Sequence, residues 1–368
     1  MKTSLFLLIL MCLAICGCKN QRHDQTATCE KVVLNPGSND LSRIDIMNIE
    51  EWIEIKADSG TYIGNVKKFE VFNSDYYILD NINQKCVLRY SSSGELINKI
   101  GKLGDGPGEY AQIYDFTIDR KNNTVLILAS QSKILIYGAD GTFKFSADLD
   151  NGLVCNIAAN KNGIMATSSY AAFSPDNKNY LLYEYNHQLE LIGKWLPYTE
   201  PAQSPYPVIM SNQLVSLGTF TYYFDNINLV IQEYDCDENE VKPLISFELK
   251  NQMPKEIYKD EMAFMSKQLE HNWIKDFVVA PTAMIISYIY GGEYCITMID
   301  QNNNVQISGK YHGMFPTNYA IDGEYIVSPI FTDSYLNYWE KQDDIIKPNF
   351  EVSEDTNLLL MKWSISNS

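Results

Sequence analysis

The sequence is poor in the residues that build metal centres and disulfide frameworks. It has only four histidines and no Cys-x-x-C pair. Beyond the N-terminal stretch the cysteines are odd in number and widely spaced, at positions 29, 86, 155, 236 and 295. Structural zinc sites need closely spaced ligands, and a disulfide framework needs an even number of cysteines. We therefore expect no metal site, no cofactor and no disulfide framework.

Runs of Lys and Arg are also missing. The chain has 29 basic and 46 acidic residues and a net charge of −17. A protein that binds nucleic acid needs a basic surface to neutralise phosphates. The charge balance therefore argues against a nucleic-acid partner.

Familiar catalytic and cation-binding motifs are absent as well. Neither Gly-x-Ser-x-Gly nor His-Glu-x-x-His occurs. The run Asp235-x-Asp237-x-Asn239 begins like a calcium loop, but Glu240 stands at its sixth position and Ser246 at its twelfth. A calcium loop of this kind needs Gly and Glu there, so we interpret the run as a solvated hairpin turn.

The N-terminus has the layout of an export signal. A short positive start precedes an apolar stretch, Ser4 to Ile15, which is too short to span a bilayer. It ends in Ile15-Cys16-Gly17-Cys18, which resembles a bacterial lipobox. We expect residues 1–17 to be a lipoprotein signal peptide, and Cys18 to be acylated and to anchor the chain to a membrane. An ordinary cleaved signal is the alternative.

Residues 18–43 are polar and non-periodic, and we expect a flexible tether there. Lys19-Asn20 does not resemble an inner-membrane retention signal, so we expect the outer membrane, with the facing left open.

From about residue 44 the chain repeats a unit of short strands. Each unit has an apolar strand that ends in Tyr or Ile, a polar turn and a further strand. The strand ends lie 47, 48, 49 and 65 residues apart, at Tyr90, Tyr137, Tyr185, Tyr234 and Ile299. A period in the forties with several short strands is typical of propeller blades. The pattern predicts an all-β fold: a six-bladed β-propeller over 44–368, with four antiparallel strands in each blade.

An inserted helix accounts for the long interval. Apolar residues recur at helical spacing within 254–273, at Ile257, Met262, Met265, Leu269 and Trp273. We expect one helix there, with this stripe packed on the edge of the propeller.

The strand Glu51–Ile55 precedes the first blade and has no blade of its own. An open ring leaves exposed strand edges. We therefore expect this N-terminal strand to close the ring by completing the last blade.

A glycine-rich run follows the first blade. It contains Gly104, Gly106, Pro107, Gly108 and Glu109, and a strand is expected directly after it. A phosphate-binding loop would instead open a helix and end in Gly-Lys-Ser/Thr. We interpret the run as a structural crossing between blades, in which glycine permits positive φ and proline stiffens the chain.

This run resembles the NHL-type propeller repeat, and the chain is similar to the six-bladed β-propeller lipoproteins of Bacteroidetes. The match is close over Gly101–Asp119, and elsewhere it follows the strand pattern. The resemblance implies a membrane-anchored binding protein of the cell envelope. It does not imply a particular ligand.

Aromatic residues gather in the segments expected at the connections between the second and third strands. A Tyr-rich face can stack on sugar rings or anchor a protein partner, although many of these side chains could instead be wedges between blades. Our candidate ligand-binding residues are Tyr110, Tyr170, Tyr222, Tyr223, Tyr288, Tyr290, His312 and Tyr335.

Three functions follow from these features. The first is a non-enzymatic binding module for a glycan, a peptide or an envelope protein. The second is a carbohydrate lyase or hydrolase with its site at the central funnel, because carboxylates from separate blades could converge there. The third is a scaffold within an outer-membrane assembly.

Overall fold

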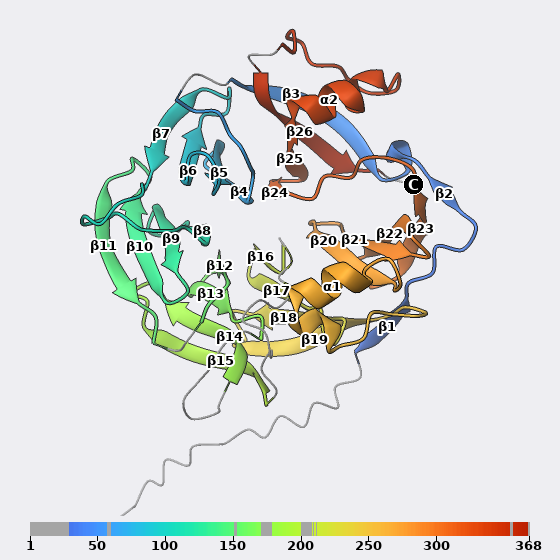
Figure 1. Ribbon diagram of the computed structural model, residues 1–368, viewed down its shortest axis with the longest axis horizontal. Helices are drawn as coiled ribbons and strands as arrows, with labels where there is room; N and C mark the ends of the chain where they lie inside the picture. The colour runs from blue at the N-terminus through green and yellow to red at the C-terminus, as the bar shows by residue number, and fades with distance from the viewer. Residues whose placement is uncertain are drawn as a thin grey trace, which may run out of the picture.

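The computed structural model describes residues 29–56, 60–150, 153–170, 179–199, 208, 210, 212–353 and 356–366. In these residues six sheets form a ring, and the predicted six-bladed propeller is confirmed (Figure 1). The first strand of each blade lies at the centre of the ring and the last at its rim. Blade 1 consists of β4 (Lys68–Phe72), β5 (Asp75–Asp80), β6 (Cys86–Tyr90) and β7 (Leu96–Ile100). Blade 2 consists of β8 (Asp115–Asp119), β9 (Thr124–Ser130), β10 (Lys133–Gly138) and β11 (Phe143–Asp148). Blade 3 consists of β12 (Asn156–Ala159), β13 (Gly163–Thr167), β14 (Asn179–Asn186) and β15 (Leu191–Tyr198). Blade 4 consists of β16 (Leu214–Leu217), β17 (Phe220–Asp225), β18 (Val230–Asp235) and β19 (Glu240–Glu248). Blade 5 consists of β20 (Trp273–Val279), β21 (Ala283–Tyr290), β22 (Glu293–Asp300) and β23 (Val305–Tyr311). Blade 6 consists of β24 (Ala320–Asp322), β25 (Tyr325–Phe331), β26 (Thr356–Ile365) and β3 (Met47–Lys56).

The ring is closed by an N-terminal strand, as the sequence predicts. β3 pairs antiparallel with β26, and the register runs from Met47 opposite Ile365 to Lys56 opposite Thr356. Figure 1 shows this blue strand beside the red end of the chain. Strands from the two ends of the chain therefore share blade 6.

The segment before β3 is more ordered than a tether. β1 (Glu30–Val33) lies parallel to β19, and β2 (Asp40–Leu41) lies parallel to β23. These two strands add a fifth strand to the outer edges of blades 4 and 5. The expectation of a flexible tether over 18–43 is thus wrong for residues 30–41, because Val32, Leu34 and Leu41 bury their side chains there.

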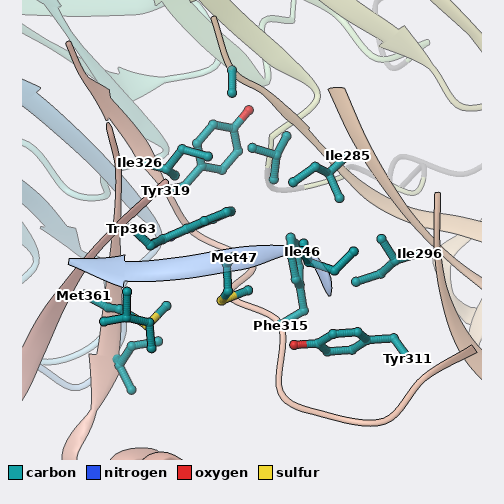
Figure 2. Close-up of a cluster of buried hydrophobic side chains, with 14 of the residues drawn as sticks. Ile46, Met47, Ile285, Ile296, Tyr311, Phe315, Tyr319, Ile326, Met361 and Trp363 are labelled. Carbon is teal, nitrogen blue, oxygen red and sulfur yellow. The ribbon is translucent and has the colours of Figure 1, made fainter. Parts of the chain in front are cut away.

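The apolar core lies between the blades. Figure 2 shows one such cluster, where the closing strand meets blades 5 and 6 and where Met47, Phe315 and Trp363 pack together. Trp363 is fully buried, and its indole N–H donates to the Ser328 hydroxyl at 3.0 Å. The N–H of a buried Trp usually finds such a partner. Ring closure therefore creates a full blade interface.

The insertion before β20 is helical but short. It contains the 3₁₀ turn η2 (Ile257–Lys259) and the helix α1 (Glu261–Lys267), whose first turn is capped by Asp260. Phe264 packs against Tyr258 and Trp273, with ring centroids 5.4 and 5.0 Å apart.

The apolar stripe predicted for this segment packs on the propeller at Ile257 and Trp273, and the prediction is wrong for the three residues between them. Met262, Met265 and Leu269 are 75%, 57% and 89% exposed, while Phe264 faces the propeller. A helix of two turns can present any one of its faces, and the larger aromatic side chain gains more from burial than the thioethers.

Further short helices were not predicted from the sequence. They are α2 (Thr332–Asn337), η1 (Arg43–Asp45) and η3 (Trp339–Lys341). No helix among the described residues is long and apolar enough to cross a membrane.

Candidate functional site

The centre of the ring contains a cavity of about 600 Å³. Its walls come from the innermost strands of five blades, β4, β8, β12, β16 and β24, and from the turns that follow them. A volume of this size is typical of a small-ligand pocket. The propeller thus brings segments more than 250 residues apart to one site.

Polar contacts tie the blades together at the end of the channel where the innermost strands begin. The Lys68 ammonium donates to the Ile157 carbonyl at 2.6 Å and to Asp115 at 3.3 Å. Asp115 is buried and also accepts from the Phe116 and Ile157 amides. These contacts link blades 1, 2 and 3. Because the buried carboxylate is paired and hydrogen-bonded, this end is fixed in place.

At the same end of the channel, Asn212 connects blades on the other side of the ring. Its side-chain amide donates to the Thr317 carbonyl at 2.6 Å and to Asp276 at 3.0 Å. Asp276 lies on β20 and is buried behind Asn212, and its other oxygen accepts from the Phe277 amide. Burial raises the pKa of Asp276 to about 7. A carboxyl that is partly protonated at neutral pH thus lies beneath the channel wall.

The mouth of the cavity lies at the opposite end, at the turns between the first and second strands. In the β16–β17 and β24–β25 turns, an added Cβ at Gly218 or Gly323 would meet nothing within 4 Å. These two turns, which line the cavity, therefore have open space beside them. We expected the functional face to carry the connections between second and third strands; the cavity is lined both by residues at the starts of the inner strands, such as Lys68 and Asn212, and by the opposite set of turns.

Blades 2 and 3 place cations at this mouth. Arg120 and Lys121 lie in the β8–β9 turn, and Lys161 lies in the β12–β13 turn. The Arg120 guanidinium donates to the Val71 carbonyl at 3.1 Å and lies 4.0 Å from Glu70. Lys161 is paired with Asp237. The positive charges therefore lie on one side of the entrance.

The walls between floor and mouth are largely apolar. Val215, Leu217 and Ile321 are half-buried and line the cavity. Glu70 is the one carboxylate among the described lining residues. Glycoside hydrolysis normally needs a pair of carboxylates, and the lining residues do not supply one.

The aromatic residues chosen from the sequence lie elsewhere. Six of them are buried within or between blades, at Tyr110, Tyr170, Tyr222, Tyr223, Tyr288 and Tyr335. The Tyr170 hydroxyl donates to Asp225 at 3.0 Å, and the Tyr335 ring packs on Trp52.

The other two candidates also lie away from the cavity. Tyr290 is half-buried at the end of β21. His312 is exposed beside β2, where it contacts Asp40 at 2.7 Å. None of the eight candidates lines the cavity. The wedge alternative describes the buried tyrosines.

The glycine-rich run connects β7 to β8. The Glu109 carboxylate accepts from the Gly106 amide at 2.9 Å and pairs with Lys102 at 2.6 Å. Gly108 has φ +75°, and an added Cβ would approach the Phe143 ring to 2.5 Å. The run forms a compact turn that packs on blade 2, and it does not line the cavity.

Two further expectations concern the lipid anchor and a metal site. Cys18 lies outside the described residues. Within the described ranges no group of three or more His, Cys, Asp and Glu side chains is placed to hold a metal ion.

Several solved structures are similar to this chain in fold. The crystal structure of a "Putative exported protein (BF0058) from Bacteroides fragilis NCTC 9343" superposes with a TM-score of 0.72 at 17% identity, over 92% of this chain and 99% of that one. The RRP9 WD40 repeats reach a TM-score of 0.49 at 9% identity, and U3-55K reaches 0.48 at 8%, each over 86% of this chain and 99% of the other. The latter two likenesses are too weak to carry an argument. No curated protein matches the sequence.

Residues 58–364 match one protein-family model, described as a domain of unknown function (DUF4934). The match begins just before blade 1 and ends within β26, so it spans nearly the whole ring. The chain therefore belongs to the DUF4934 family.

Proposed function

We propose that this chain is an exported binding protein that holds a small ligand in the central cavity of its propeller. The observation that carries the proposal is the cavity of about 600 Å³ at the centre of the ring, which is lined by five blades and bordered by polar contacts between them. Concave sites with apolar walls and a few fixed polar groups are the usual form of small-ligand sites. The exported protein of similar fold from Bacteroides fragilis supports the cellular location.

Membrane anchoring is a second part of the proposal. We infer that Cys18 is acylated after removal of residues 1–17 and that the ring is held at the outer membrane. β1 begins at Glu30, so 11 residues separate Cys18 from the first strand of the ring. We expect labelled palmitate to be incorporated by the native chain and not by a Cys18→Ser variant. Equal labelling of the two proteins would rule out this anchor.

Binding is better supported than catalysis. The carbohydrate lyase or hydrolase that we kept as an alternative needs groups that can exchange protons at one point of the funnel. Glu70 is the one carboxylate among the described lining residues, and Asp276 is covered by Asn212. From the sequence we expected a glycan, a peptide or a protein partner. We now propose a small ligand, or one end of a larger ligand, that enters the channel.

A cavity-filling substitution tests this function. The Cys18→Ser protein is screened against a glycan array, a small-molecule library and an envelope extract, and each retained ligand is measured by calorimetry. Leu217→Trp should weaken binding at least about tenfold, because the larger side chain occupies the half-buried wall of β16.

The matched control is Leu96→Trp on the outer strand β7, where the side chain is 37% exposed. It should leave the affinity unchanged. Thermal unfolding of both variants checks that each is folded. A ligand whose affinity is the same for Leu217→Trp and the parent protein would place its site outside the cavity.

A further inference from the structure

The ligand class follows from the charge at the mouth of the cavity. We propose that the cavity takes a small organic anion, with its acidic group against Arg120 and Lys121 and its apolar body in the channel. This inference rests on the proposed function, because it assumes that the cavity is occupied.

The charge of the lining is opposite to that of the chain. The whole chain carries −17, with 46 acidic residues against 29 basic ones. The lining residues instead include Lys68, Arg120, Lys121 and Lys161, against the acid Glu70. Lys68 is paired with Asp115 and Lys161 with Asp237, so the charge available to an incoming anion lies at Lys121 and at Arg120, which is 4.0 Å from Glu70.

The acidic groups around the mouth on the side of blades 2 and 3 already have partners within the chain. The Asp119 carboxylate contacts His187 at 2.7 Å. Asp237 is paired with Lys161, and across the ring Asp322 is paired with Lys362. Glu324 is exposed in the β24–β25 turn of blade 6, which lies across the ring from blade 3. An anion is therefore drawn toward Arg120 and Lys121.

Arg120 is held in a geometry that leaves donors for a ligand. Its guanidinium lies 5.8 Å from the centre of the Phe72 ring and donates one hydrogen bond to the Val71 carbonyl. Glu70 lies 4.0 Å away, beyond hydrogen-bond distance. A guanidinium has five N–H donors, so most of them remain for an incoming acid. In the described part of the chain Lys121 forms no ion pair, and its side chain is exposed.

The channel below these cations suits an apolar body. Val215, Leu217 and Ile321 line it, and Ala158 and Ala159 leave room on the side of blade 3. A ligand with an acidic group at one end and an apolar body matches this arrangement. A neutral ligand of the same shape would gain the apolar contacts and lose the charged ones.

Two naphthalene dyes of matched shape test the inference. 8-Anilinonaphthalene-1-sulfonate carries an acidic group, and N-phenyl-1-naphthylamine lacks it. Fluorescence titration of the Cys18→Ser protein should show that the sulfonate binds at least about tenfold more tightly and that salt weakens only its binding. Arg120→Gln with Lys121→Gln should weaken the sulfonate about tenfold and leave the neutral dye unchanged.

The control is Lys133→Gln with Lys144→Gln, which makes the same change of charge at two exposed positions of β10 and β11. It should leave both dyes unchanged. Equal effects of the two charge variants, equal affinities for the two dyes, or no binding of the sulfonate would overturn the inference.

Leu217→Trp separates this failure from that of the proposed function. If it abolishes the binding of both dyes while the charge variants have equal effects, the cavity binds ligands without selecting anions. If both dyes bind Leu217→Trp as tightly as the parent protein, the cavity is not their site, and the proposed function loses its support together with this inference.

Discussion

Asp276 shows how a single buried carboxyl ties stability to pH. Its pKa is raised from 3.8 to about 7 by burial, so between these values the folded chain binds a proton that the unfolded chain releases. A raised carboxyl pKa stabilises the fold at low pH, and this contribution is lost as the pH rises through about 7. Burial also raises the pKa of Asp225 and Glu233, which act in the same direction.

We predict that Asp276→Asn reduces the loss of stability between pH 5 and pH 8. The asparagine cannot ionise, so the difference in unfolding free energy between the two pH values should shrink by roughly 3 kcal/mol. Urea denaturation at both pH values measures this. Asp140→Asn is the control, because backbone hydrogen bonds lower the pKa of Asp140, which therefore titrates below this window. An unchanged pH dependence in Asp276→Asn would mean that this carboxyl is already ionised in the fold.

Gly108 and Gly218 allow steric crowding to be separated from backbone strain. Both have positive φ, +75° and +63°, but an added Cβ meets the Phe143 ring only at Gly108. Alanine at either position should cost about 1 kcal/mol for the backbone conformation. Gly108→Ala should cost about 1–3 kcal/mol more for overpacking. Equal midpoints of urea denaturation for the two variants would show that the crossing relaxes around the methyl group.

At the scale of elements, the N-terminal strands offer a matched pair of valines. Val32 is buried against blade 4, whereas Val33 is 61% exposed on the same strand. Val32→Ala should lower the unfolding free energy by about 1–3 kcal/mol and Val33→Ala by less than about 0.5 kcal/mol. Equal, negligible effects in thermal unfolding would restore the view that residues 30–41 are a free tether.

The sequence predicts the strands better than the segments around them. A strand of alternating or continuous apolar residues between polar turns is a local pattern, so Cys86–Tyr90 and Lys133–Gly138 are visible without the fold. β1 and β2 have four and two residues, too few for a period to be recognised. The face that α1 buries is set by the position of Phe264 between Tyr258 and Trp273, which is a property of the packing.

At the scale of the whole molecule, closure of the ring is predictable and the position of the site is not. The repeat period and the unmatched strand before blade 1 together predict a closed ring, because exposed strand edges are unfavourable. The cavity is formed by short segments of five blades, such as Lys68, Lys161 and Ile321. No spacing along the chain marks these residues as neighbours.

The frequency of tyrosine does not locate the cavity either. The chain has 25 tyrosines, and Tyr223, Tyr234 and Tyr288 are fully buried between strands. Side chains in a propeller blade face the neighbouring blades, and a large ring fills the widening space between them. A pattern of aromatic residues therefore reports the wedge shape of the blades as readily as a binding face.

A crystal structure of the Cys18→Ser protein with bound 8-anilinonaphthalene-1-sulfonate tests the central claim most directly. We predict density for the dye inside the channel, with its sulfonate within hydrogen-bond distance of Arg120 and its rings against Val215 and Leu217. Dye bound on the exposed surface of Met262, Met265 and Leu269, with the channel empty, would contradict the account.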